Sequence, residues 1–130
     1  MTATTTPARR LLKVLIVDDL PQVRHDLRLL LELSGELEIS GEAGTGLEAV
    51  TQAQALQPEV ILMDLEMPIM NGYEAAAQIK KLSPACRVIA LSIHNYPAAW
   101  QRAAQAGMDG FIAKGAPLNV ILDTIKERIS

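Results

Sequence analysis

Three aspartates and one lysine follow short apolar runs in this 130-residue chain, and they are the residues best suited to chemistry. Asp18 and Asp19 follow one run, Asp64 ends a second, and Lys114 follows another. Carboxylates only a few ångströms apart cannot all stay ionised unless a pKa rises or a cation lies among them. A hard divalent cation such as Mg²⁺ suits such oxygen ligands and leaves room for a phosphate oxygen. With it, Asp64 could act as a carboxylate nucleophile on phosphorus.

Two further polar residues complete this set. Ser92 ends the run "ALS" and supplies a hydroxyl donor, and Lys114 ends "FIAK" and supplies a mobile charge that can pair with a phosphoryl group. Taken alone, Ser92 is typical of a turn and Lys114 of a solvated surface. Their joint occurrence at successive strand ends indicates a site.

Short β-type runs alternate with helical patterns along the whole chain. The predicted strands are residues 12–18, 37–43, 59–65, 87–93 and 109–113. The predicted helices are residues 21–34, 46–56, 72–82, 97–106 and a last helix from Pro117 onward. Five βα units of this kind predict an α/β fold, a doubly wound five-stranded parallel sheet with helices on both faces.

The apolar content of each strand predicts its place in the sheet. Continuous apolar runs at 14–17, 60–63 and 88–91 are typical of strands buried on both faces, whereas 37–43 alternates and contains a glycine, as an edge strand does. A sheet order of 2-1-3-4-5 would place the first and third strands side by side at the switch point where such sheets bind ligands. The three aspartates would then share one cleft.

Composition excludes several classes of protein. The net charge is only −3 and the basic residues are scattered, so we expect no direct nucleic-acid contact by this domain. The lone Cys86 can form no internal disulfide, and no apolar stretch approaches the roughly 20 residues that span a bilayer, so we expect a soluble, cytoplasmic protein without a membrane segment. The Thr-rich residues 1–10 are expected to be a disordered tail that precedes a single domain at 11–130.

The segments "LIVDD", "DLEMPIMNG", "LS" and "FIAKG" resemble, at these spacings, the receiver domain of bacterial two-component response regulators over residues 11–130. The resemblance implies the flavodoxin-like (βα)5 fold and Mg²⁺ as cofactor. It also implies a role for each site residue: Asp64 as phosphoacceptor, Asp18 and Asp19 as the acidic metal pocket with the backbone carbonyl of Glu66, Ser92 as switch hydroxyl, Phe111 as its partner aromatic, and Lys114 as the phosphate-pairing lysine.

The same resemblance implies a signalling function. A sensor histidine kinase would donate the phosphoryl group, and the domain would catalyse only its own phosphorylation and autodephosphorylation, so it is not expected to be an enzyme. "GEAGTGLEAV" and "LSIH" are most similar to the NarL/FixJ subfamily, whose receivers usually precede a LuxR-type helix-turn-helix domain. This chain lacks such a domain, so we expect either a fragment or a stand-alone receiver, with transcription as the expected output.

Three alternatives compete with this interpretation. Residues 44–49, "GTGLEA", fit a dinucleotide-binding fingerprint with Asp64 twenty residues further on, but the preceding strand is predicted at the sheet edge. A flavin-binding protein would share the sheet order, yet "DDLPQ" after the first strand would repel its phosphate. A degenerate receiver that only binds proteins would not need the complete set of carboxylates and lysine.

Four apolar residues support additional hypotheses. Leu29 and Leu33 are expected on the first helix opposite its core stripe, where they would contact a partner or a second copy in a homodimer. Ile93, beside the predicted switch hydroxyl, would either narrow the path of the attacking water or serve packing alone. Trp100 lies in an Ala-rich helix and would either report a movement of that helix or mark the edge of the core.

Overall fold

The computed structural model of the protein describes residues 10–127. Of the predicted tail at 1–10, only Arg10 lies within the described residues, where its guanidinium donates to both Glu59 carboxylate oxygens at 3.0 and 2.7 Å. No helix in this part of the chain is long and apolar enough to cross a membrane.

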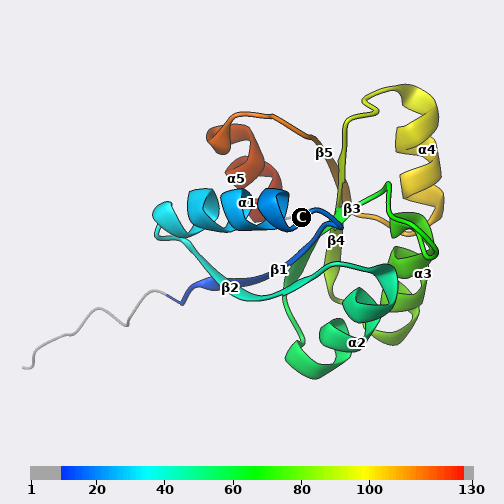
Figure 1. The fold of residues 1–130 in the computed structure, drawn as a ribbon, viewed down its shortest axis with the longest axis horizontal. Helices are drawn as coiled ribbons and strands as arrows, with labels where there is room; N and C mark the ends of the chain where they lie inside the picture. Colours follow the sequence, from blue (N-terminus) through cyan, green and yellow to red (C-terminus); the bar gives the residue numbers. More distant parts are fainter. Residues whose placement is uncertain (1–9, 128–130) are drawn as a thin grey trace, which may run out of the picture.

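Strands and helices alternate throughout the described residues (Figure 1). The strands are β1 (Leu12–Val17), β2 (Leu37–Ala43), β3 (Val60–Asp64), β4 (Arg87–Ser92) and β5 (Gly110–Ala113). The helices are α1 (Pro21–Leu33), α2 (Gly46–Leu56), α3 (Gly72–Leu82), α4 (Pro97–Gln105) and α5 (Leu118–Lys126). All strand pairs are parallel in the order β2-β1-β3-β4-β5, which confirms the predicted doubly wound α/β sheet.

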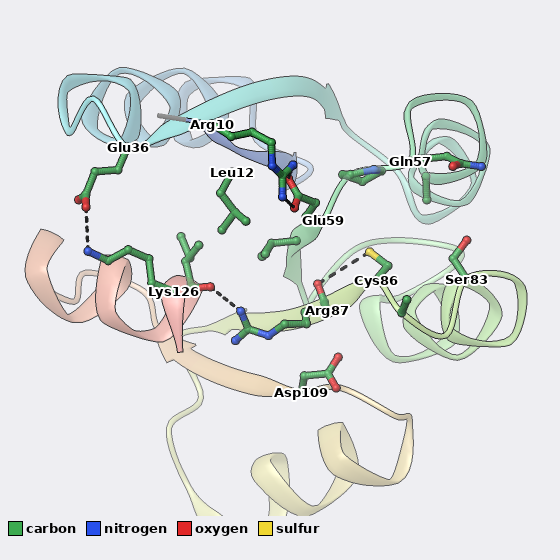
Figure 2. A pocket seen from close by; sticks show the side chains of 15 residues that line it. Arg10, Leu12, Glu36, Gln57, Glu59, Ser83, Cys86, Arg87, Asp109 and Lys126 are labelled. Atoms are coloured by element: carbon green, nitrogen blue, oxygen red, sulfur yellow. Dashed lines mark hydrogen bonds and ion pairs between the residues drawn. The ribbon is translucent and has the colours of Figure 1, made fainter. Parts of the chain in front are cut away.

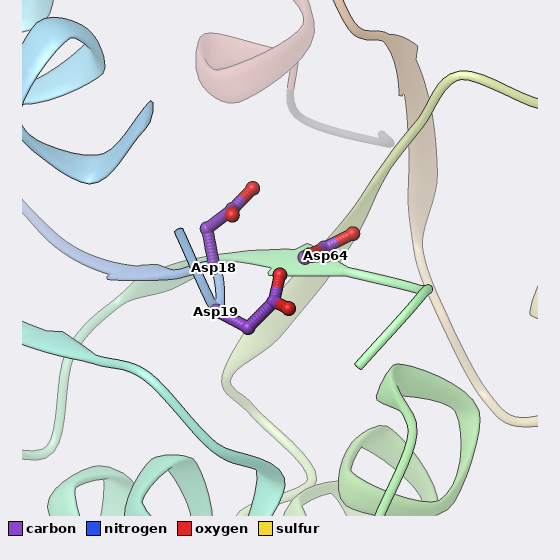
Figure 3. A group of neighbouring side chains, drawn as sticks. All are labelled: Asp18, Asp19 and Asp64. Atoms are coloured by element: carbon purple, nitrogen blue, oxygen red, sulfur yellow. The ribbon is translucent and has the colours of Figure 1, made fainter. Parts of the chain in front are cut away.

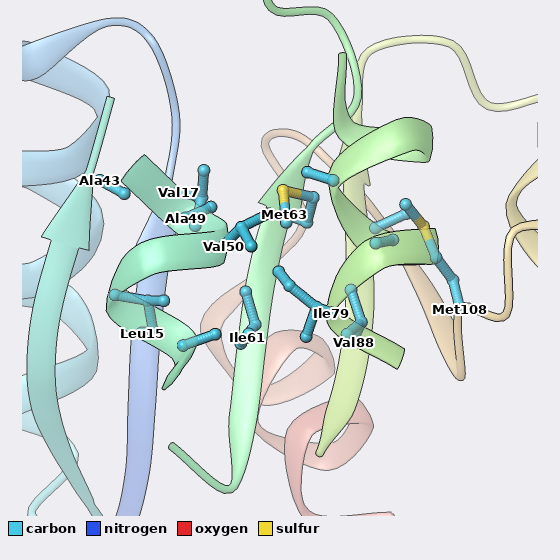
Figure 4. Close-up of a cluster of buried hydrophobic side chains, with 14 of the residues drawn as sticks. Leu15, Val17, Ala43, Ala49, Val50, Ile61, Met63, Ile79, Val88 and Met108 are labelled. Atoms are coloured by element: carbon cyan, nitrogen blue, oxygen red, sulfur yellow. The ribbon is translucent and has the colours of Figure 1, made fainter. Parts of the chain in front are cut away.

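The sheet separates two apolar layers, because successive side chains of each central strand point to opposite faces. Helices α1 and α5 cover one face, and α2, α3 and α4 cover the other (Figure 1). Figure 4 shows the second layer, in which the strands contribute the buried residues Leu15, Val17, Ile61, Met63, Val88 and Ala90. On the opposite face they contribute Val14, Ile16, Val60, Leu62, Ile89 and Leu91. Burial on both faces explains the continuous apolar runs of β1, β3 and β4.

The edge strand β2 fixes where β1 ends. Its register with β1 shifts by one residue at Ser40, whose hydroxyl donates to the Val14 carbonyl at 3.2 Å. Pairing then continues until Val17 lies opposite Ala43, and the Asp18 N–H donates to the Ala43 carbonyl at 3.1 Å. Asp18 therefore follows the strand directly, at the carboxyl edge of the sheet.

Helix α4 is attached to the sheet by small side chains. It buries only Ala99 and Ala103, whereas α5 buries Ile121 and Ile125. Since hydrophobic stabilisation grows with the apolar area removed from water, α4 gains less from packing than α5 does.

Gly72 allows the first turn of α3 to approach the end of β3. A Cβ atom at this position would collide with the Asp64 carbonyl oxygen and would lie 2.9 Å from the Leu65 Cα, both backbone atoms. The Gly72 N–H also donates to the Leu65 carbonyl at 3.2 Å. Only glycine fits there without a displacement of the segment that carries Asp64.

We expect Gly72→Ala to lower the free energy of unfolding by about 1–3 kcal/mol, because the added methyl group must push two backbone segments apart. Urea unfolding of the purified variant measures this change. Gln78→Ala, an exposed substitution on the same helix, is the control and should change stability by less than about 0.5 kcal/mol. Wild-type stability of Gly72→Ala would contradict the close approach.

Candidate functional site

Asp18, Asp19 and Asp64 lie together at the carboxyl ends of β1 and β3, and are called the acidic cluster below (Figure 3). Each contributes a carboxylate oxygen to a group whose members all lie within 4.8 Å of one another. Asp18 and Asp64 are buried, at 0% and 1% exposure, and Asp19 is half-buried. The structure thus brings together the three aspartates that the sequence pattern placed in one cleft.

Lys114 connects the two buried members of the acidic cluster. Its Nζ lies 3.0 Å from Asp18 Oδ2 and 3.1 Å from Asp64 Oδ1. The lysine follows β5, and its backbone N–H donates to the Ser92 carbonyl at 2.9 Å, which fixes the start of its loop. One ammonium group therefore faces two buried carboxylates, and the site carries excess negative charge.

The remaining contacts of the site leave one carboxylate oxygen of Asp64 without a hydrogen-bond donor among the described residues. The Leu20 N–H donates to Asp18 Oδ1 at 2.9 Å, and the Glu66 N–H donates to Asp64 Oδ1 at 3.1 Å. Asp64 Oδ2 is buried and has no hydrogen-bond partner among the described residues, and Asp18 Oδ2 has only the ion pair with Lys114. Buried carboxylate oxygens without donors are rare unless they serve a ligand or an ion.

Burial is the main electrostatic influence on this site. Burial, followed by the charge of Asp18, raises the pKa of Asp64 from its ordinary value of 3.8 to about 6, and the contacts with Lys114 offset this only in part. Burial alone would lower the pKa of Lys114, but its contacts with Asp18 and Asp64 outweigh burial and raise it. At neutral pH the lysine is therefore a cation, and the aspartate is a carboxylate in an unfavourable environment.

The donor set fits a hard divalent cation. The acidic cluster offers carboxylate oxygens from three residues within a small space, two of them buried and short of donors. Mg²⁺ requires oxygen ligands and retains waters, and a half-exposed ligand such as Asp19 leaves the site open on one side. A cation bound there would offset the excess negative charge, which adds to the effect of burial in raising the pKa of Asp64.

Ser92, at the end of β4, is fully buried and has a specific partner. Its Oγ donates to the Glu66 carboxylate, at 3.0 Å to Oε1 and 3.3 Å to Oε2, and accepts from the His94 N–H at 2.9 Å. The side chain of His94 is also close to Glu66, with 3.8 Å between Nε2 and Oε1. The family resemblance implies only a backbone role for Glu66, and no sequence motif predicts the contact between its side chain and Ser92.

Phe111, in β5, is half-buried and packs against the core beside α4. Its ring meets that of Trp100 edge to face, with 6.3 Å between the ring centroids. The Trp100 indole N–H donates to Asn95 Oδ1 at 3.0 Å, and the side chain remains 46% exposed. Trp100 is therefore a direct neighbour of the aromatic residue predicted to move with Ser92.

The glycine-rich segment at 44–49 caps a helix in this structure. The N-cap hydroxyl of Thr45 accepts the Glu48 N–H at 3.0 Å, and the Glu48 carboxylate accepts the N–H of Gly44, the residue before the cap, at 3.0 Å. The segment follows the edge strand β2. Since a carboxylate already occupies the position that a pyrophosphate would need, this turn does not support dinucleotide binding.

A pocket of about 1040 Å³ opens at the other end of the sheet (Figure 2). It is lined by the first residues of β3 and β4 and by both ends of the described chain, and none of the acidic cluster contributes to it. Its charged groups pair with one another or with backbone: Arg10 with Glu59, Lys126 with Glu36, and Arg87 with the last carbonyls of α5. The pocket is therefore separate from the candidate site.

Comparison with known proteins gives a consistent result. A family model described as the response regulator receiver domain matches residues 14–126. The response regulator protein VraR of Staphylococcus aureus is 38% identical over 116 residues, which are 89% of this chain and 56% of VraR. The chain thus spans about half the length of the curated relatives it matches.

Solved structures agree with this assignment. The receiver domain of the response regulator NarL from Mycobacterium tuberculosis superposes with a TM-score of 0.83 at 33% identity, covering 92% of this chain and 99% of that one. A LuxR-family DNA-binding response regulator from Staphylococcus aureus gives a TM-score of 0.81 at 28% identity, with 88% and 96% covered. Relatives of this kind support the predicted NarL/FixJ-like subfamily.

We expect Asp64→Asn to raise the free energy of unfolding at pH 7.5, without Mg²⁺, by about 1–3 kcal/mol. The pKa of Asp64 is about 6 in the folded protein and 3.8 otherwise, so the folded state binds its proton more tightly. The free energy of unfolding of the wild type therefore falls as pH rises from about 4 to 6. Above this range Asp64 is ionised in the folded protein, and the full destabilisation by its buried charge is present. Urea unfolding at pH 7.5 and 4.5 measures the difference, which should shrink at the lower pH.

Asp123→Asn is the matched control, since Asp123 is an exposed aspartate of α5, and it should change stability by less than about 0.5 kcal/mol. A destabilised Asp64→Asn at pH 7.5 would mean that the Lys114 contacts outweigh burial.

Proposed function

The chain belongs to the response regulator receiver domain family, and from this membership we propose that it accepts a phosphoryl group on Asp64 from a sensor histidine kinase. The observation that carries the proposal is the buried Asp64 carboxylate beside Lys114 and two further aspartates, with one oxygen that accepts no hydrogen bond from residues 10–127. This arrangement combines a nucleophile, a cation for the incoming phosphoryl group and ligands for a metal ion.

In the proposed reaction Asp64 Oδ2 attacks the phosphorus of a kinase phosphohistidine, and the phosphorus–nitrogen bond breaks as the new phosphorus–oxygen bond forms. Oδ2 is assigned this role because Oδ1 accepts from the Glu66 N–H and lies 3.1 Å from the Lys114 ammonium. Lys114 would hold a phosphoryl oxygen by its charge. Hydrolysis of the acyl phosphate would return the carboxylate, so the domain acts only on its own phosphoryl group.

Asp18, Asp19, Asp64 and the backbone carbonyl of Glu66 would hold Mg²⁺. When bound, the cation supplies positive charge that shields the attack of one anion on another. The fold positions the Asp64 nucleophile. Because Asp18 and Asp64 are buried, little water surrounds their carboxylates.

Ser92 and Phe111 would convert phosphorylation into a change of shape. The Ser92 hydroxyl would move toward a phosphoryl oxygen, and Phe111 would turn inward into the space that this movement vacates. Because Phe111 packs beside Trp100 on α4, its rotation would alter the surface formed by α4, β5 and α5. The weak packing of α4 through Ala99 and Ala103 favours such a change.

The partners are proposed from the same family membership. Beyond the kinase, we propose a LuxR-type DNA-binding effector as the output, because the matched structures include a LuxR-family regulator and the match covers only 56% of VraR. Transcription would be controlled through that domain, and the setting would be the cytoplasm. Leu29 and Leu33 of α1 are 51% and 83% exposed and are candidates for a contact with the kinase or a second copy.

Incubation with a small acyl-phosphate donor and Mg²⁺ should add one phosphoryl group to the wild type and none to Asp64→Asn. Intact-mass measurement detects the product, and a chelator should abolish it because the cation is required for the attack. Asp123→Asn, which replaces an exposed aspartate far along the chain, should be modified like the wild type. An unmodified wild type would favour the alternative of a receiver that only binds proteins.

Ile93→Ala should shorten the phosphorylated lifetime several-fold. Ile93 is 70% exposed, so it contributes little to the core, and this exposure favours a role at the entrance to the site over packing alone. Loss of the side chain would widen the path of the attacking water. Decay of the acyl phosphate, followed by mass or by radiolabel, measures the lifetime, and an unchanged rate would exclude the role.

A further inference from the structure

The hydroxyl of Ser92 has a single proton, and in this structure that proton is directed at Glu66. The donor distances are 3.0 Å to Oε1 and 3.3 Å to Oε2, so the proton is shared between the two oxygens of one carboxylate. The His94 N–H, at 2.9 Å, occupies an acceptor position of the same hydroxyl. Hydrogen bonds to a charged acceptor are stronger than those between neutral groups, so this contact holds Ser92 in its present orientation.

A phosphoryl group on Asp64 would compete for the same proton. Phosphoryl oxygens accept hydrogen bonds and do not donate them when ionised, so Ser92 can approach one only as a donor. With one proton to give, the hydroxyl cannot satisfy both Glu66 and the phosphoryl group fully. A full hydrogen bond to the phosphoryl group therefore forms at the expense of the hydrogen bond to Glu66.

Glu66 can release Ser92 without a large penalty. Its side chain is 39% exposed, so water can replace the serine as donor to the carboxylate. In this structure His94 Nε2 also lies 3.8 Å from Glu66 Oε1. The contact is therefore strong enough to bias the position of Ser92 and weak enough to be overcome by a bound phosphoryl group.

We propose that the Glu66 side chain is a positioning residue that holds Ser92 in the inactive orientation by competing with the phosphoryl group for the serine proton. This inference rests on the proposed function, because it assumes a phosphoryl group on Asp64. Glu66 thus has two separate roles: its backbone contributes to the metal site, and its side chain opposes activation.

Charge repulsion is the competing explanation for any effect of Glu66. A carboxylate near the site would disfavour an anionic ligand even without a contact to Ser92. The two explanations differ in their chemistry, since repulsion needs the charge of Glu66, whereas competition needs a hydrogen-bond acceptor and the serine hydroxyl. Glu66→Gln removes the charge and keeps an acceptor oxygen, and Glu66→Ala removes both.

The experiment measures binding of beryllofluoride, a phosphoryl mimic, to the whole chain by titration calorimetry with Mg²⁺ present. We expect Glu66→Ala to tighten binding by roughly three- to tenfold, because the hydroxyl no longer has to leave a partner. Glu66→Gln should tighten binding clearly less than Glu66→Ala does, because its amide oxygen still accepts from Ser92, although a neutral acceptor holds the hydroxyl more weakly than a carboxylate. In a Ser92→Ala background, the further change Glu66→Ala should alter the dissociation constant by less than about twofold, because the two residues act as a unit.

Other outcomes would overturn the inference. Equal tightening by Glu66→Ala and Glu66→Gln, persisting in the Ser92→Ala background, would establish charge repulsion instead. Unchanged binding by Glu66→Ala would show that the contact does not oppose activation. A wild type that binds no beryllofluoride and accepts no phosphoryl group would remove the proposed function itself, which distinguishes that failure from a failure of the competition alone.

Discussion

The structure depends on a charge imbalance at the carboxyl ends of two adjacent strands. Asp18 and Asp64 are both buried there, and Lys114 is the cation placed between them. Burial of carboxylates is unfavourable unless they are neutralised, and one ammonium group cannot neutralise two. Burial first, and the charge of Asp18 second, raise the pKa of Asp64, and the contacts with Lys114 offset this only in part. The fold thus maintains a site that added positive charge would stabilise, and a divalent cation could provide that charge.

The sheet holds these charged residues in place because apolar side chains pack against both of its faces. The residues of β1 and β3 contribute to two independent apolar layers, so neither strand can slide without loss of burial on both sides. Each aspartate is therefore held at the end of a rigid element. The residues proposed to move, Ser92 and Phe111, lie instead in β4 and β5, next to the weakly packed α4.

Much of the fold and of the acidic cluster could be predicted from the sequence. Continuous apolar runs identify central strands because burial on both faces leaves no polar positions, and parallel strands bring Asp18 and Asp64 to one edge by topology alone. The contact of Ser92 with the Glu66 side chain was not predictable, since it depends on the rotamer of a loop residue two positions after Asp64. The contact between the Phe111 and Trp100 rings likewise depends on how α4 packs against β5, which the sequence pattern does not specify. The GTGLEA segment shows the converse: a phosphate-loop pattern is also a capping sequence, and only the Glu48 contacts distinguish the two.

The alanine-mediated attachment of α4 has an evolutionary consequence. A helix that contributes two methyl groups to the core places few demands on the rest of its sequence, so its outward positions can diversify at little cost in stability. The carboxyl end of the sheet allows less variation, because Lys114 contacts both buried aspartates and loss of one charge would leave the others without compensation. A fold of this kind can therefore keep its acidic cluster while the exposed surface of α4 changes.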